Sequence, residues 1–449
     1  MRQWLGHRKK WIRGVSFALV LVLAFLMTSS PLADMAELSR IYDLLSGTIE
    51  DPQTGPEYLE LANIAIGRKE YKVALEHLAK ARQLTDGEDA TTLSELWLKS
   101  ASVQALLGDP EQANSCLAEA LALDPESTQA LLLRAQLAIT AESYEAAVED
   151  LEVYLALAPE DGNTRLTLAQ LYEGVGRYVD AKDQYQRMAD AAEEGGGDAH
   201  LLNALRCGFL NGDYEESMAG FEAYLAGHPQ AAADHRSVAQ FLRAACLMQL
   251  SRWEEAVDGF RAAMDEGYDP ASCMEQMMLC SFDAGNFEDT LAFAQEMLDK
   301  ELAPNSEDVF YQRRGIAMMQ TARYEEAVES LTQSIERNAG LAGSYYYRGV
   351  SLLSLEKYDE AIADFTASIE SGFLPQYCYY NRGVCYIQKV EYDEALNDFE
   401  KTLTEGDDPD LIQGAKDILW QLAAYYENQA ALTETPEMRV ADSDAAGQG

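Results

Sequence analysis

The sequence is poor in the residue patterns that mark a chemical site. Its five histidines form neither an H-E-x-x-H motif nor a Cys–His metal spacing. The run Gly195-Gly196-Gly197 is followed by Asp198 and lacks the Lys-Ser/Thr of a phosphate loop. No G-x-S-x-G or calcium-loop pattern occurs. We therefore expect no catalytic residue, no metal and no cofactor, and we predict that the chain is not an enzyme.

Cysteine is scarce, and its spacing argues against a disulfide framework. Cys273 precedes Cys280 by seven residues, and Cys378 precedes Cys385 by the same interval. Two helical turns separate such a pair by roughly 10.5 Å, too far for a disulfide or for two ligands of one zinc ion. The seven cysteines are predicted to be small buried residues rather than redox or metal-binding groups.

Basic residues are scarce as well. The chain has 34 lysines and arginines against 76 aspartates and glutamates, and its net charge is −42. A surface this acidic repels nucleic acid and anionic lipid headgroups, so we expect no nucleic-acid partner. Two interpretations remain: the charge keeps an extended surface soluble, or it steers the chain toward a basic partner.

What the sequence does contain is one helical-hairpin pattern, repeated ten times between Gly55 and Leu403. Nine copies place an aromatic residue three before a small one, and the remaining copy has Pro110 before Ala113. A fixed period of this size means that each unit buries its apolar face only by stacking on its neighbours. The repeats start near residues 55, 94, 128, 162, 198, 237, 271, 308, 342 and 376, mostly 34 residues apart.

Each unit is predicted to form two amphipathic helices, A and B, and we number its residues from the start of the repeat. The eighth position, in helix A, is often small, and the twenty-fourth, in helix B, is often large. Small residues let the two helices approach closely, and large ones fill the space between them. Examples are Ala135, Ala169, Gly315, Gly349 and Gly383 at the eighth position, and Leu151, Tyr185, Phe221, Phe260, Phe365 and Phe399 at the twenty-fourth.

These features resemble the tetratricopeptide repeat (TPR) family, whose consensus has aromatic, Leu, Gly, aromatic, Ala, Phe, Ala and Pro residues at these positions. The likeness covers about three quarters of the chain. The resemblance implies an all-α fold, a right-handed α-solenoid of about ten helix-turn-helix units. It also implies that the helices A line a concave face that holds peptides or partner proteins, and it implies no catalysis.

The first 33 residues have the pattern of an export signal, because five basic residues precede a stretch without charge over residues 14–33. The segment is either a signal peptide or an uncleaved signal-anchor, since 20 uncharged residues just span a bilayer. Pro31 makes the cleavage site poor. The basic end stays cytoplasmic in both cases, so we expect an exported, extracytoplasmic chain, anchored by this segment or secreted. The basic residues are Arg2, Arg8, Lys9, Lys10 and Arg13.

The expected domains follow from the repeats and from composition. The only Gly-rich break between repeats is predicted to be a flexible joint, and the last residues, which lack any period, are predicted to be disordered. The expected segments are 1–33 (leader), 34–54, 55–193 (repeats one to four), 194–197 (joint), 198–404 (repeats five to ten), 405–430 (cap) and 431–449 (disordered tail).

The cap is expected to be an amphipathic helix over Leu411–Gln429 that covers the last repeat. Four large side chains are predicted to provide the covering face. They are Leu419, Trp420, Leu422 and Tyr425.

By the family's geometry, the second, fifth, ninth and twelfth positions of helix A tend to face the groove. The ninth position changes from polar to apolar halfway along: Asn63, Ser102, Gln136, Gln170, Arg206, then Ala245, Leu279, Ile316, Val350, Val384. Such an apolar row is either a partner site or a surface that the chain itself covers. The candidate site in repeats eight to ten consists of Val309, Gln312, Ile316, Met319, Tyr346, Val350, Leu353, Tyr377, Tyr380, Val384 and Ile387.

Among repeats six to ten, four arginines share the seventh position. They form either a cationic ladder for an acidic ligand or ion pairs with helix B that stiffen the stack. The arginines are Arg243, Arg314, Arg348 and Arg382, and the expected acidic partners include Asp258, Asp364 and Asp398.

The function predicted first is a non-catalytic scaffold or adaptor that binds protein or peptide segments, basic or apolar, in the groove of repeats eight to ten. The alternative is a structural spacer or self-associating envelope protein, and a third hypothesis is an enzyme's regulatory accessory subunit. Contact with a membrane is expected only through the N-terminal segment. Capture of a peptide by a monomer would support the first hypothesis, and assembly without ligand would support the second.

The leader generates a direct prediction. Residues 1–40 fused to a reporter that is active only outside the cytoplasm should give reporter activity, because a basic end precedes an uncharged stretch. A silent reporter, together with an active cytoplasmic fusion, would show that the leader has been misinterpreted. Carbonate fractionation then separates an anchored product from a released one.

Overall fold

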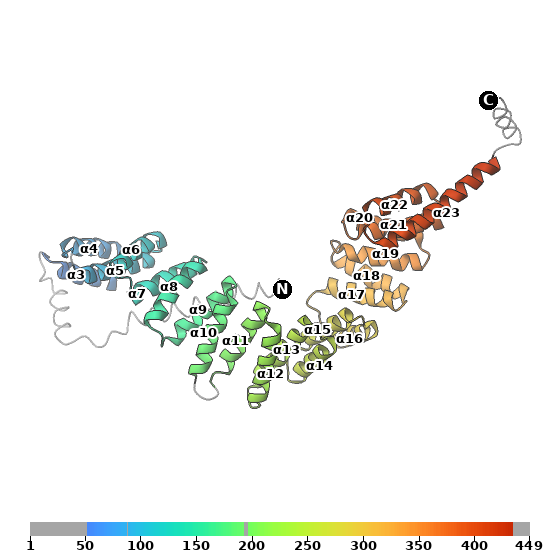
Figure 1. Cartoon of the computed structure of the whole chain (residues 1–449). Helices are drawn as coiled ribbons and strands as arrows, with labels where there is room; N and C mark the ends of the chain where they lie inside the picture. The colour runs from blue at the N-terminus through green and yellow to red at the C-terminus, as the bar shows by residue number, and fades with distance from the viewer. Residues whose placement is uncertain (1–51, 88, 193–195, 434–449) are drawn as a thin grey trace, which may run out of the picture. The chain divides into compact units, whose positions relative to one another are not determined.

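The computed structural model describes residues 52–87, 89–192 and 196–433 (Figure 1), with side chains up to Glu427. These residues form 21 helices and no strand. The expected leader, most of the segment 34–54, the start of the expected joint at 194–197 and the expected tail from residue 434 lie outside them. Within the described ranges, no helix combines the length and the apolar character needed to cross a lipid bilayer.

Twenty helices form ten A–B pairs, as the sequence predicted. The helices A are α3 (Gly55–Gly67), α5 (Ala90–Leu107), α7 (Thr128–Thr140), α9 (Gly162–Val175), α11 (Asp198–Asn211), α13 (Ala233–Gln249), α15 (Pro270–Asp283), α17 (Glu307–Gln320), α19 (Ala342–Ser354) and α21 (Pro375–Gln388). The helices B are α4 (Tyr71–Leu84), α6 (Pro110–Leu123), α8 (Tyr144–Leu157), α10 (Tyr178–Ala191), α12 (Tyr214–Gly227), α14 (Trp253–Asp265), α16 (Phe287–Asp299), α18 (Tyr324–Arg337), α20 (Tyr358–Glu370) and α22 (Tyr392–Glu405). Every helix B begins at the predicted aromatic residue or at Pro110.

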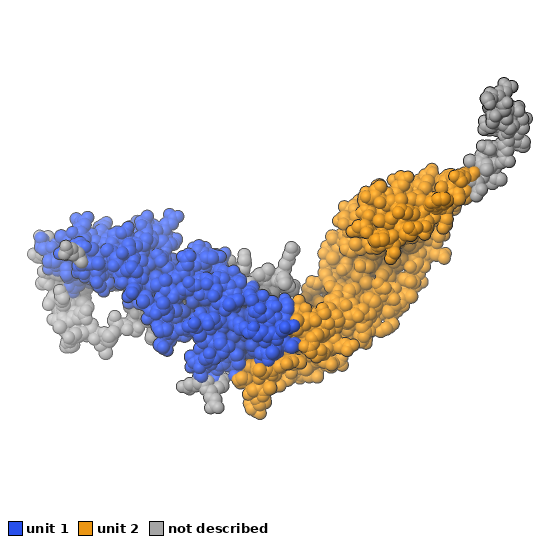
Figure 2. Space-filling view, in the orientation of Figure 1, with its two compact units in different colours: residues 1–220 blue, residues 221–449 orange. Residues whose placement is uncertain are grey.

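The chain divides into two compact units, residues 1–220 and residues 221–449 (Figure 2), and each is described by itself. The border falls within α12, whereas the sequence predicts a joint at 194–197; that joint remains a prediction. In the second unit, each helix A from α17 onward contacts the next one, so α17, α19 and α21 form a continuous row. This row carries the candidate site.

The small residues in the first turn of each helix B lie in the core. All ten residues at the twentieth position are buried, nine of them completely. The pairing of the eighth and twenty-fourth positions is equally tight. A Cβ atom added to Gly349 would lie 2.9 Å from Phe365, and one added to Gly383 would lie 3.0 Å from Phe399. Helix A therefore approaches helix B as closely as the sequence predicted.

The turns between helices A and B share one backbone conformation. The fifteenth residue of every repeat has a positive φ, and the amide of the following residue donates to the carbonyl five residues back, as Glu391 does to Tyr386 at 2.9 Å. Glycine adopts this conformation without strain. Only four repeats have glycine there, and the others have Lys69, Glu142, Ser251, Ala322, Glu356 and Val390.

Val390 gives a stability prediction, because a β-branched residue is strained at its φ of 65°. Its side chain is 65 % exposed, so removing it loses little packing. Val390→Gly should raise the free energy of unfolding by about 1 kcal/mol in urea titrations. The matched reverse change, Gly176→Val, should lower it by a similar amount. Equal stabilities of Val390→Gly and the parent would show that the turn tolerates a β-branched residue without strain.

Candidate peptide-binding groove

The predicted site residues lie on α17, α19 and α21, and most of them keep part of their surface accessible. Six apolar side chains are half-buried, whereas Ile316 is only 8 % exposed. The Gln312 amide donates to the Ser344 hydroxyl of the next repeat at 3.0 Å. Gln312 and Ile316 therefore take part in the packing between repeats. The half-buried apolar side chains are Val309, Met319, Val350, Leu353, Val384 and Ile387.

Tyr346 lies in the interface between repeats nine and ten. Its ring centroid is 6.2 Å from that of Phe365, in helix B of the same repeat. It is 6.1 Å from the ring centroid of Phe373, in the turn that follows this helix B. The residue also packs against the core cluster that contains Cys378 of α21. Burial raises the pKa of the Tyr346 hydroxyl to about 12. This tyrosine therefore stabilises the stack of repeats.

Tyr377 and Tyr380 contact the segment that follows repeat ten, and Tyr380 also packs on helix B of its own repeat. The Tyr377 hydroxyl donates to Asp408 at 2.6 Å. The Tyr380 ring lies 5.6 Å from Phe399, and a Cβ atom added to Gly414 would be 3.0 Å from the Tyr380 hydroxyl. The eleven predicted residues thus divide into a group that joins neighbouring repeats and a group of half-buried apolar side chains.

The last helix, α23 (Pro409–Thr433), continues the row of helices A formed by α17, α19 and α21. The sequence predicted this helix as a cap but not its place in the row. The helix begins 34 residues after α21, so it occupies the place of helix A in an eleventh unit. Ile418, at the ninth position of this unit, is half-buried and packs with Val384 and Ile387 against one core cluster. The interval between Pro375 and Pro409, equal to the repeat length, was the signal that could have shown this.

Three of the four side chains predicted to cover the last repeat do contact it. Leu422 is buried, Leu419 packs against the core of repeat ten, and the Tyr425 ring lies 5.0 Å from that of Tyr392. Trp420 was predicted to join them, and this is wrong, because its side chain is 80 % exposed. The physical reason is helical geometry: Trp420 lies one residue from Leu419 and two from Leu422, and neighbouring residues on a helix point to different faces.

One of the polar ninth-position residues of the first unit, Gln136, is buried and does not present its amide to the groove. It is 6 % exposed, and neither amide atom has a hydrogen-bond partner among the described residues. Gln136 lines a cavity of about 10 Å³ together with Thr164 and Thr167. That volume suffices for a single water molecule.

Two of the seventh-position arginines make the predicted ion pairs with helix B. Arg348 binds Asp364 through two nitrogens at 2.8 and 2.7 Å, and Arg382 binds Asp398 at 2.8 Å through two nitrogens. A third nitrogen of Arg382 donates to Thr366 in helix B of the preceding repeat at 2.8 Å. The hydrogen bonds to Asp398 raise the pKa of the Arg382 guanidinium. Each arginine thus joins three helices of two repeats.

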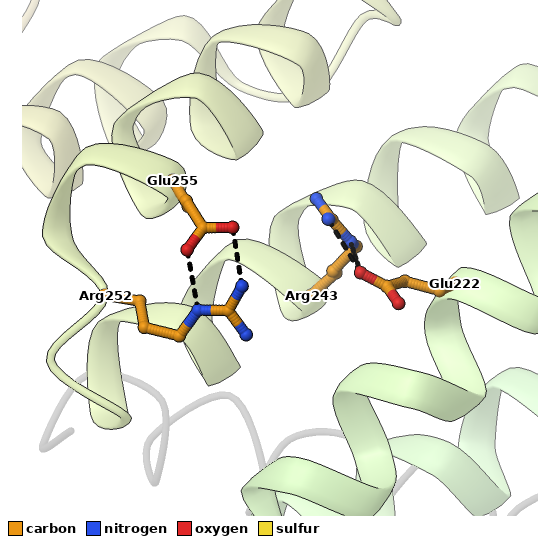
Figure 3. A network of polar contacts seen from close by, with 4 residues as sticks. All are labelled: Glu222, Arg243, Arg252 and Glu255. Atoms are coloured by element: carbon orange, nitrogen blue, oxygen red, sulfur yellow. Dashed lines mark hydrogen bonds and ion pairs between the residues drawn. The ribbon is translucent and has the colours of Figure 1, made fainter.

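The predicted partner of Arg243 is wrong, because this arginine pairs with Glu222 at 2.8 Å rather than with Asp258 (Figure 3). In both confirmed pairs the acid stands 16 residues after the arginine. Asp258 follows Arg243 by 15 residues, and Gly259 occupies the pairing position. The same spacing of 16 would have identified Arg134, which binds the buried Asp150 at 2.8 Å.

Asp398 tests the energetic role of these ion pairs. Asp398→Ala should lower the free energy of unfolding by about 3 kcal/mol, because it leaves the largely buried Arg382 without its carboxylate. Asp258→Ala is the matched control: it removes an exposed aspartate that does not pair with Arg243, so its effect should stay within about 0.5 kcal/mol. Equal effects of the two substitutions in urea titrations would contradict this assignment.

The cysteines have no part in the groove's chemistry. All seven are buried, and none forms a disulfide in the described part of the chain that holds them. Burial raises the pKa of the Cys246, Cys280 and Cys385 thiols to about 12, which disfavours the thiolate form at neutral pH. Among the described residues, no group of three His, Cys, Asp or Glu side chains is placed to hold a metal ion.

Comparison with solved structures finds similar helical repeats at low identity. The chain is 14 % identical to a chain of the Naa15/Naa10 complex bound to HypK-THB, with a TM-score of 0.46, over 80 % of this chain and 65 % of the other. It is 18 % identical to YrrB, described as a TPR protein with an unusual peptide-binding site, with a TM-score of 0.37, over 44 % of this chain and 97 % of YrrB.

Comparison of sequences gives the family. The tetratricopeptide repeat model matches residues 99–162, 313–375 and 351–410. Human tetratricopeptide repeat protein 7B is 30 % identical over an alignment of 163 residues that covers 34 % of this chain. The chain spans only 19 % of the length of that relative. With its ten A–B helix pairs and these matches, the chain belongs to the tetratricopeptide repeat family.

Proposed function

We propose that this protein is a non-catalytic scaffold or adaptor that binds protein or peptide segments in the groove of repeats eight to ten. Tetratricopeptide repeat proteins generally act as protein-interaction scaffolds, and the proposal assigns that role to one part of this chain. The site consists of the half-buried apolar side chains on α17, α19 and α21, extended by Ile418 on α23.

One observation carries the proposal: the same apolar row crosses four consecutive helices of type A. Ile316, Val350, Val384 and Ile418 follow one another at intervals of 34 residues, and α17, α19, α21 and α23 contact each other in that order. Packed helices lie about 10 Å apart, a distance that roughly three residues of an extended peptide span. A segment with an apolar side chain at every third or fourth residue fits this spacing.

The chemistry of the partner follows from the groove and from the charge of the chain. Partly exposed Val, Leu, Ile and Met side chains favour apolar side chains on the bound segment, and methionine adapts to different shapes. The net charge of −42 favours a segment that also carries basic residues and accelerates its association at low salt. We propose further that the repeats lie outside the cytoplasm, with the segment 1–33 as their signal or anchor.

The groove can be tested with peptides selected from a random 12-residue library on the full chain. The double variant Val350→Gln, Ile387→Gln should weaken their binding at least tenfold, because two apolar contacts are lost at about 1 kcal/mol each. Gln170→Ala, a half-buried ninth-position residue of the first unit, is the control and should leave affinity unchanged.

Two results would contradict this function. Unchanged affinity of the double variant, with unchanged helical content, would place the site elsewhere. Concentration-dependent assembly without any ligand, measured by sedimentation, would favour the self-associating spacer instead.

A further inference from the structure

Among the described residues, the last helix, α23, occupies the place of a helix A and is not followed by a helix B. In the complete repeats, the eleventh position of helix A lies three residues, close to one helical turn, after the eighth position that packs against helix B. The side chains there are mostly buried, with exposures of 4 % for Tyr172, 2 % for Met318 and 2 % for Leu352. The equivalent residue of α23, 34 residues after Tyr386, is Trp420, and its side chain is 80 % exposed. An exposed tryptophan thus occupies a position that is buried in seven of the ten complete repeats.

Trp420 is the most exposed of the large apolar side chains in the described residues. The other residues on the same face of α23, at the fourth, seventh and eighth positions, are Gln413, Lys416 and Asp417, all of them exposed. Asp417 stands where Gly315, Gly349 and Gly383 allow close approach of a helix B in their repeats, and it accepts a hydrogen bond from Gln413 at 2.8 Å. The uncovered face therefore combines one large apolar anchor with one carboxylate and one lysine.

The net charge of the last two helices, α22 and α23, favours a basic helix as the partner of this face. Between Tyr392 and Thr433 the sequence has ten acidic residues and only two basic ones, Lys401 and Lys416. A second copy of this chain would bring further acidic residues to the same place. A helix with basic residues would instead find carboxylates, and an aromatic anchor such as Trp420 is the residue type that contributes most at interfaces.

We propose that the uncovered face of α23 binds a basic amphipathic helix of a partner protein, in the place of an eleventh helix B. An apolar side chain of this helix packs on Trp420, and a lysine or arginine pairs with Asp417. This surface is separate from the groove, because Trp420 occupies a position that faces helix B and Ile418 a position that faces the groove. The two sites can therefore be tested independently.

The probe is a synthetic 14-residue helix, the length of α22, with leucine on one face and lysine on the other. Titrated into the full chain, it should bind Trp420→Ala at least tenfold more weakly than the parent. Val179→Ala is the matched control, because that apolar side chain is 62 % exposed and lies in the first unit. The Val350→Gln, Ile387→Gln variant should bind the probe like the parent, and this result separates the α23 site from the groove. The same peptide with glutamate in place of lysine should bind much more weakly.

Three outcomes would overturn the proposal. Equal binding of the probe to Trp420→Ala and the parent, with equal helical content, would show unspecific attraction between charges. Loss of binding in the groove variant would assign the probe to the groove. A dimer of the parent that Trp420→Ala dissociates, measured by sedimentation, would show that a second copy covers the tryptophan.

Discussion

The close approach of helix A to helix B within each repeat is the contact on which the rest of the structure depends. Gly315, Gly349 and Gly383 leave no room for a Cβ atom against Leu331, Phe365 and Phe399, respectively. This contact fixes the angle and spacing of the pair, and the pair then presents a constant surface to the next repeat. The row of groove residues follows from this contact. Equivalent side chains of successive helices A line up only when neighbouring A–B pairs have the same geometry.

Stacking also determines which groove residues remain available to a partner. Tyr346 and Tyr380 occupy the same position in neighbouring repeats, and both pack against the element that follows them. The ninth-position residues Val350 and Val384 are half-buried and retain accessible surface. Large aromatic side chains therefore stabilise the stack, and the smaller aliphatic side chains form the accessible apolar row. The ion pairs of Arg348 and Arg382 strengthen the same repeats by joining consecutive helices B.

The repeat period predicted where the helices begin. It did not predict the backbone conformation of the turns, the partner of one arginine or the exposure of one side chain. In nine of the ten repeats, the aromatic residue of the pattern marked the first residue of helix B. The left-handed conformation of Val390 and Ala322 could not be read from residue type, since tertiary packing imposes it against local preference. Arg243 was assigned a partner one residue out of place, because a helix changes face by about 100° with each residue. The exposure of Trp420 could not be predicted from an amphipathic pattern that requires only that some residues face the core.

The central claim is that each repeat is held by its own A–B contact and by its nearest neighbours. Hydrogen exchange of the Phe365→Ala variant, read by mass spectrometry, tests this claim most directly, because Phe365 is fully buried against Gly349. The account predicts faster exchange in α19, α20 and the adjacent helices α18 and α21, with unchanged rates in α3 to α10. A uniform increase along the whole chain would contradict it, since the repeats would then unfold as one cooperative body.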